Sequence, residues 1–155
     1  MDHIAIMKKS WGFTDKIMVG EKTIESRWYG IKCRPWGRIK KGDMVYFKDA
    51  GALVSAAAEV TRVEEIADLS PQKMQEILGR YGAAIGIRRA HIPSFFSTLK
   101  NKKYCILIHL KNPRRMRPFA INKTGFGAMS AWMTVSSIGR VRVPLKIASL
   151  TGQTK

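Results

Sequence analysis

One short segment carries three charged side chains at spacings that suit a binding or catalytic site. Lys22, Glu25 and Arg27 fall within six residues. Side chains two apart in a strand share a face, so Glu25 and Arg27 should point the same way, and Lys22 joins them only if the strand begins after it. The alternative is an ordinary surface ion pair, which contributes little to stability.

The same three side chains suit three kinds of chemistry. In a binding site, Lys22 and Arg27 would contact a phosphate or a base edge while Glu25 orients Arg27. In amide hydrolysis, Glu25 would position or deprotonate water and a cation would stabilise the oxyanion. In RNA cleavage, the same groups would supply a base and phosphate contacts without a metal. Binding asks least of the residues, so it is the preferred interpretation.

Aromatic residues form a second candidate group, because the chain has four tryptophans. Trp28 and Trp36 have polar or turn-forming neighbours, and we expect them to be exposed. Interleaved with basic residues, they suit a platform on which bases stack. Trp132 follows a glycine-rich loop and would either close one side of a cleft or cap the barrel. The competing expectation for each tryptophan is that it fills the core.

Positive charge is concentrated in the second half of the chain. The formal net charge is +17, from 28 Lys and Arg and 11 Asp and Glu, and no acidic residue follows Glu76. A charge of this size favours an anionic partner, and nucleic acid, RNA or DNA, is the leading candidate. Arg114, Arg115 and Arg117 form the densest basic run, and we expect phosphate contacts there, although such runs are usually just solvated.

Several classes of protein are excluded by composition. Cys33 and Cys105 form no CxxC pair and the three histidines have no ligand spacing, so we expect neither a metal site nor a cofactor. No stretch of the chain is long and apolar enough to span a membrane, and the first residues lack the order of a signal peptide. Reduced thiols then predict a cytoplasmic protein.

Strand patterns dominate the chain and predict an α+β fold, a small and mostly antiparallel β-barrel with short helices around it. Expected strands cover residues 3–8, 22–29, 44–48, 53–63, 104–110 and 130–136. Expected helices cover residues 13–19, 71–81 and 94–100, with Ser70 as N-cap and Gly82 as the end of the second. Residues 113–118 would form a basic loop or edge. We expect one domain over residues 1–148 and a tail over residues 149–155.

The segment Gly20-x-Lys22-x-x-Glu25-x-Arg27 resembles the GxKxxExR signature of ASCH domains, which belong to the PUA-like superfamily. The run from Lys41 to Phe47 resembles the turn that leads into the next strand of that family. The resemblance covers roughly residues 3 to 138. It implies a PUA-like β-barrel with a cleft that binds RNA or a nucleotide, and Lys22, Glu25 and Arg27 are the site residues that carry over.

The resemblance also implies enzymatic alternatives. One branch of ASCH proteins hydrolyses N4-acetylcytidine with a Lys, a Thr three residues on and a distant Glu. Lys22 matches the Lys, Glu25 stands in place of the Thr, and Glu76 is a possible counterpart of the distant Glu. Other ASCH proteins are ribonucleases. The sequence thus predicts an RNA-binding ASCH-like domain, with a metal-independent hydrolase or a protein-interaction module of a transcription or ribosome-associated assembly as alternatives.

Overall fold

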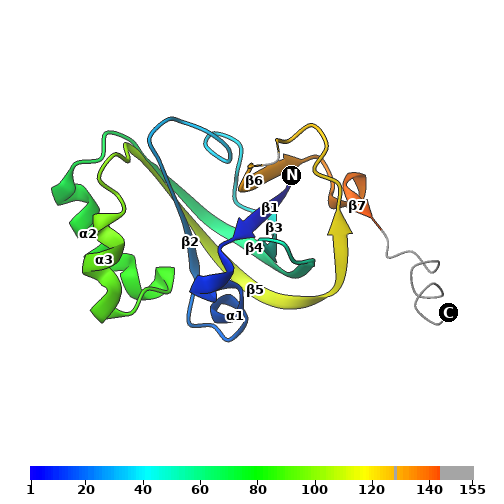
Figure 1. Ribbon diagram of the computed structural model, residues 1–155, viewed down its shortest axis with the longest axis horizontal. Coiled ribbons are helices and arrows are strands. Elements are labelled where there is room, and N and C mark those ends of the chain that lie inside the picture. The colour runs from blue at the N-terminus through cyan, green and yellow to red at the C-terminus, as the bar shows by residue number, and fades with distance from the viewer. Residues whose placement is uncertain (128, 144–155) are drawn as a thin grey trace.

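The strand patterns of the sequence join into one curled sheet (Figure 1). The computed structural model describes residues 1–127 and 129–143, and the expected tail lies outside them. The sheet has seven strands within the described residues. They are β1 (Asp2–Met7), β2 (Ile24–Tyr29), β3 (Met44–Asp49), β4 (Val54–Ile66), β5 (Tyr104–Ile121), β6 (Trp132–Val135) and β7 (Arg142–Val143).

Three α-helices accompany the sheet in the described part of the chain: α1 (Phe13–Met18), α2 (Pro71–Ile85) and α3 (Ile92–Ser97). The described residues also form three short 3-10 helices, namely η1 (Lys9–Trp11), η2 (Arg89–His91) and η3 (Ile138–Arg140). Ser70 caps α2 as expected, because its side chain accepts from the Lys73 amide. Figure 1 shows α2 and α3 together at one end of the molecule.

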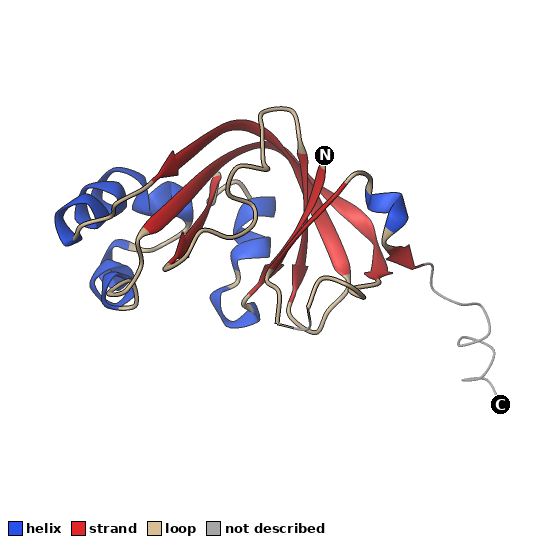
Figure 2. Cartoon of the chain, turned by 90° about the horizontal axis from the view of Figure 1, so that it is seen from above, coloured by secondary structure: helices blue, strands red, loops and turns tan. Residues whose placement is uncertain are grey.

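The sheet is open and strongly curved, which makes it a half-barrel (Figure 2). Its strand order is β2-β5-β4-β3-β1-β6, with β7 paired to β5. Every pairing is antiparallel except β1 with β3. Register shifts between β4 and β5 supply the bends that curl the sheet. This confirms the expected mostly antiparallel sheet, with β2 and β6 as the two free edges of the path.

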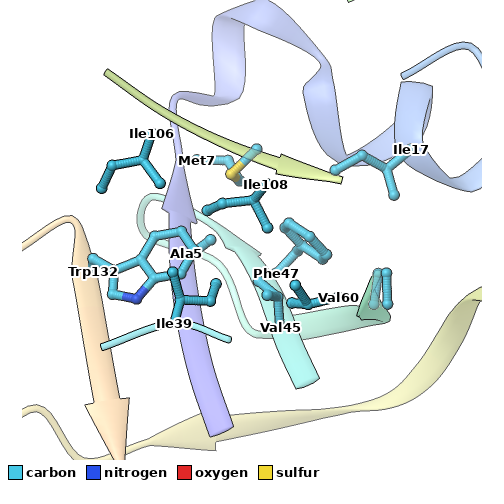
Figure 3. Close-up of a cluster of buried hydrophobic side chains, with 12 residues drawn as sticks. Ala5, Met7, Ile17, Ile39, Val45, Phe47, Val60, Ile106, Ile108 and Trp132 are labelled. Carbon is cyan, nitrogen blue, oxygen red and sulfur yellow. The ribbon is translucent and has the colours of Figure 1, made fainter. Parts of the chain in front are cut away.

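Three clusters of buried side chains fill the molecule. The first lies inside the curl and joins β1, β3, β4 and β5, with Phe47 and Trp132 as its aromatic members (Figure 3). The second packs α2 and α3 on β2 and β5 through residues such as Trp28 and Leu78. The third lies on the other side of the sheet, around Phe119.

Bulges in β4 correct one expectation about its faces. Simple alternation predicts Val54, Ala56, Ala58 and Val60 on one face, but Val54 belongs to the third cluster while the other three belong to the first. The register shift between Val54 and Ala56 puts the two residues on opposite sides. All three consecutive alanines from Ala56 on are fully buried.

The second helix is longer than expected. Gly82 does not end α2, which runs on to Ile85 and stops at Gly86 with φ of 98°. A Cβ on Gly82 would stand 2.8 Å from Ile92 Cδ1, so this glycine allows α3 to approach α2 closely. The residues after Gly82 are good helix formers, and this explains why the helix continues.

The basic segment 113–118 is part of β5 rather than a loop. Arg115 lies opposite Ala56 and Arg114 opposite Ala57 in the ladder with β4. Pro113 and Pro118 both fall at register shifts of that ladder, where a missing N–H costs no ladder hydrogen bond. Within the described residues, no helix is both long and apolar enough to cross a membrane.

Candidate functional site

Lys22 lies just before β2 begins, which lets its side chain turn toward Glu25. Its ammonium donates to the carbonyl oxygens of Ile24 (2.8 Å) and Ile85, and stands 3.0 Å from Glu25 Oε1. Only 1% of the residue is exposed, and Gly86 packs directly against its methylene chain. Since an ammonium has three hydrogens, this arrangement leaves none for a ligand.

Glu25 is the buried centre of the charged cluster, with 3% of its surface exposed. One oxygen pairs with Lys22, and the other accepts from Arg27 Nε at 2.9 Å. Burial by itself raises the pKa of Glu25, but the charges of Lys22 and then Arg27 outweigh burial and hold the pKa below its usual value. Glu25 is therefore ionised at neutral pH.

Arg27 joins the two sides of the open sheet. From β2 its guanidinium donates to the Ala131 carbonyl (3.2 Å), next to β6, and to the Ile6 carbonyl (3.3 Å) on β1. Its centre lies 5.1 Å from the Trp132 ring centroid. Arg27 thus bridges β2 to β1 and to the residue before β6, and no backbone hydrogen bond joins β2 to either strand in the described part of the chain. One Nη1 hydrogen lacks an acceptor among the described residues.

A fully buried histidine, His3, holds the Trp132 side chain in place through a hydrogen bond. Trp132 Nε1 donates to His3 Nδ1 at 3.1 Å, and His3 Nε2 lies 2.8 Å from Asp43 Oδ2. Indole can only donate, so Nδ1 must accept and the His3 proton sits on Nε2. Burial is the main cause that lowers the pKa of His3, against the opposing effect of Asp43. No pattern in the sequence had assigned His3 or Asp43 to the site.

A cleft of about 470 Å³ lies above Glu25 and Arg27. Lys8 and Lys102 stand at its sides, and neither pairs with a carboxylate in the described part of the chain. Its aromatic lining consists of Trp11, Phe13, Trp28, Tyr29 and Phe95. The cleft therefore combines aromatic walls, cations and one buried, neutralised carboxylate.

The exposure of the tryptophans differs from the expectation. Trp28 is only 9% exposed, because it packs under α3 in the second cluster, so its predicted exposure is wrong. Trp132 is 3% exposed and fills the core. Trp36 is half-buried against Tyr104 and does not line the cleft. Trp11, which the sequence patterns did not single out, is 44% exposed and lines the cleft.

The three arginines of β5 do not form one surface. Arg115 pairs distantly with Asp15 of α1 (3.9 Å), and its ladder partner Ala56 belongs to the first cluster. Arg114 lies opposite Ala57, which belongs to the third cluster. The alternation of the strand therefore sends Arg114 and Arg115 to opposite faces. All three arginines, Arg117 included, are exposed.

This geometry bears on the catalytic interpretation of the cluster. Both oxygens of Glu25 are engaged by cations, and the Lys22 ammonium is enclosed. A general base needs a free acceptor atom within reach of the proton that it removes. Among the described residues, no group of three or more His, Cys, Asp or Glu side chains is arranged to hold a metal ion.

No protein-family model and no curated protein sequence matches the chain. Solved structures do resemble it: ASCH from Zymomonas mobilis aligns with a TM-score of 0.65 at 11% identity, over 94% of this chain and 98% of that one. A mutant of that protein aligns with a TM-score of 0.65 at 11% identity, over 97% of this chain and 96% of that one. A second mutant gives 0.56 at 13% identity, over 99% and 94%.

The chain therefore has the fold of the ASCH protein from Zymomonas mobilis. Identity this low shows the fold alone. The fold-level resemblance inferred from the segment Gly20–Arg27 is confirmed.

Proposed function

We propose that this chain is a nucleic-acid-binding ASCH-like domain that takes single-stranded RNA and holds one unpaired nucleotide in the cleft above Glu25 and Arg27. The observation that carries the proposal is the lining of that cleft. An exposed indole, Trp11, stands beside two cations, Lys8 and Lys102, and the carboxylate below is already neutralised. Aromatic faces and unpaired cations together are what an unstacked nucleotide requires.

Each lining residue has a distinct part in this proposal. Trp11 offers its ring for stacking, edge-on to Phe95 with 6.0 Å between the ring centroids. Lys8, 5.2 Å from the Trp11 ring, and Lys102 contact the phosphate. Arg27 donates its remaining Nη1 hydrogen to an acceptor on the base. Glu25 and Lys22 act through Arg27, by fixing the plane of its guanidinium.

The exposed arginines of β5 supply sequence-independent attraction. No acidic residue follows Glu76, so this half of the chain has a net charge of +15. Contacts from Arg115 and Arg117 to phosphates would add to affinity through release of counterions. The cleft selects an unpaired base, and the basic surface holds the strand on either side of it.

Fluorescence anisotropy with fluorescein-labelled single-stranded RNA, and with DNA of the same sequence, tests the proposal. Replacing Trp11 with Ala should weaken RNA binding by about 1–3 kcal/mol, the value of one stacked base. Trp36→Ala is the matched control, because Trp36 does not line the cleft. Equal weakening in the two variants, or none in Trp11→Ala, contradicts the proposal. Tighter binding of DNA than of RNA would mean that the cleft binds single-stranded DNA instead.

No observation at the site specifically favours a hydrolase or a protein-interaction module, which stay predictions from the sequence. The engaged state of Lys22 and Glu25 fits a positioning role. Incubation with N4-acetylcytidine and with RNA tests the hydrolase directly, and turnover that Glu25→Gln abolishes would favour it. Capture of a protein partner that survives nuclease treatment would favour the interaction module.

A further inference from the structure

A second and larger cavity, of about 600 Å³, adjoins the cleft. It lies between α1, the segment that follows α2, and α3. Its volume falls in the range of roughly 300–1,000 Å³ that is usual for small-ligand sites. The sequence motif contributes none of its lining residues, so the motif does not account for it.

The two cavities share one wall. Trp11, Phe13, Phe95 and Thr98 line both of them. Trp11 stands at this boundary, with its ring in edge contact with Phe95 and tilted against Phe13. A ligand that occupied both cavities would therefore cross the aromatic wall, and successive bases of one strand could contact it from the two sides.

The second cavity is electropositive. Lys16, Arg88 and His91 line it, and no Asp or Glu does. Lys16 Nζ donates to the Gly86 carbonyl at 2.7 Å, which fixes its position at the rim. Arg88 is exposed and forms no ion pair with any described residue. The hydroxyls of Ser10, Ser94 and Thr98 complete a lining that suits a phosphate and a sugar.

We propose that this cavity binds the nucleotide next to the one in the cleft, with its phosphate on Arg88 and its base against the Trp11–Phe95 wall. The proposal rests on the proposed function and extends it, because it makes a dinucleotide the unit that the chain recognises. The phosphate between the two nucleotides then passes over the shared wall. Lys16 lines the same cavity and adds positive charge there, and His91 offers a ring nitrogen for a hydrogen bond.

Neighbouring arginines provide a matched pair of variants. Arg88 lines the cavity and Arg89 does not, although both are exposed and adjacent in sequence. Arg88→Gln and Arg89→Gln remove the same charge from nearly the same place. Any effect of general electrostatics is therefore common to both variants, and a difference between them reports the cavity.

Competition against a labelled RNA, with ribonucleoside 5′-monophosphates and with diribonucleotides of each base, measures the gain from the second nucleotide. In the unaltered chain, the best dinucleotide should bind at least about tenfold more tightly than the best mononucleotide, as expected for added charge-assisted hydrogen bonds and stacking. Arg88→Gln should remove most of that gain, and Arg89→Gln should keep it.

The outcomes separate this proposal from the proposed function. If mononucleotides and longer RNA bind but the second nucleotide adds nothing, the second cavity is no nucleotide site and the cleft still stands. The same holds if Arg88→Gln and Arg89→Gln reduce the gain equally. If neither mononucleotide nor longer RNA competes, the proposed function fails and this proposal fails with it.

Discussion

Arginine does two different things in two regions of this molecule. Arg27 of β2 has 13% of its side chain exposed and is engaged with Glu25, a β1 carbonyl and the Trp132 ring. Arg115 of β5 has 66% of its side chain exposed and reaches one carboxylate only at 3.9 Å. The residue type is the same, but Arg27 is mostly buried and holds parts of the fold together, whereas Arg115 is exposed and available to a ligand.

The contrast shows where charge shapes this protein and where it attracts a ligand. The Lys22–Glu25–Arg27 cluster balances most of its charge internally and ties the edges of the half-barrel together. Its field acts mainly within the fold. The three arginines of β5 have no such close acidic partner among the described residues and contribute to the field outside the molecule. The region with the motif is therefore not the region that carries the net charge.

Breaking the buried cluster should have the largest effect. Lys22→Met leaves Glu25 with one of its two cations in a buried place, and we expect a decrease of about 3–5 kcal/mol in the free energy of unfolding. Urea denaturation followed by fluorescence measures it. Lys22→Met combined with Glu25→Gln should be less destabilised than the single variant. A decrease below about 1 kcal/mol, as for an exposed ion pair, would contradict the contrast.

Acid should destabilise the buried region through His3. Burial lowers the pKa of His3, so in the folded protein it stays neutral below pH 6.5, where the unfolded chain takes up a proton. The contribution of His3 to the free energy of unfolding is fully present above that pH. It decreases as the pH drops toward the folded pKa, by at most about 1.4 kcal/mol per pH unit. Unfolding measured between pH 7 and 5 should show a shallower slope in His3→Gln. His91→Gln, at an exposed histidine, should keep the slope.

Substitutions in the exposed region should change the salt dependence of RNA binding and leave the free energy of unfolding nearly unchanged. Replacing Arg114, Arg115 and Arg117 together with Gln should lower the slope of log K against log salt by about 0.7 for each phosphate of single-stranded RNA that the protein no longer neutralises. The free energy of unfolding should stay within about 0.5 kcal/mol of the unaltered value. Anisotropy titrations at several salt concentrations measure the slope. An unchanged slope would show that the three arginines of β5 do not contact phosphates of the RNA.

Single replacements should show a small difference between the two faces of β5. Arg115 lies on the side of α1, whose Phe13 and Lys16 line the cavities, while Arg114 lies on the opposite face. Arg115→Gln should therefore weaken RNA binding slightly more than Arg114→Gln, as measured by the same anisotropy titrations. A larger effect of Arg114→Gln would place the strand of RNA on the other face of the sheet.

Much of the fold could be predicted from local patterns. Alternation in residues 22–29 and the apolar run over residues 104–110 predicted two strands, which the structure pairs with each other. Ser70-Pro71 predicted the start of α2. The errors arose where packing overrode a local signal. Gly82 is a usual helix end, but contact with α3 makes it an interior residue. Prolines 113 and 118 suggested a loop, but bulges in the ladder accommodate them.

The site was predicted less completely than the fold. Lys22, Glu25 and Arg27 come together as their spacing suggested. The walls of the cleft come from η1 and from the segment that holds α3 and the turn before β5, two regions that lie far apart in sequence. Trp11 follows two lysines, and that neighbourhood was an available signal for it. Trp28 has polar neighbours in sequence, but α3 covers it, and no local pattern reports such cover.

By itself, the sequence determined the strands, the motif and the uneven charge, because these depend on residue type and spacing along the chain. Only the tertiary structure decided which charges are free. Lys22 is enclosed because α2 ends beside it. Arg27 is held where the two sides of the sheet meet, with part of its guanidinium open to the cleft. Burial and partners set the availability of a charge, and both are made by segments distant in sequence.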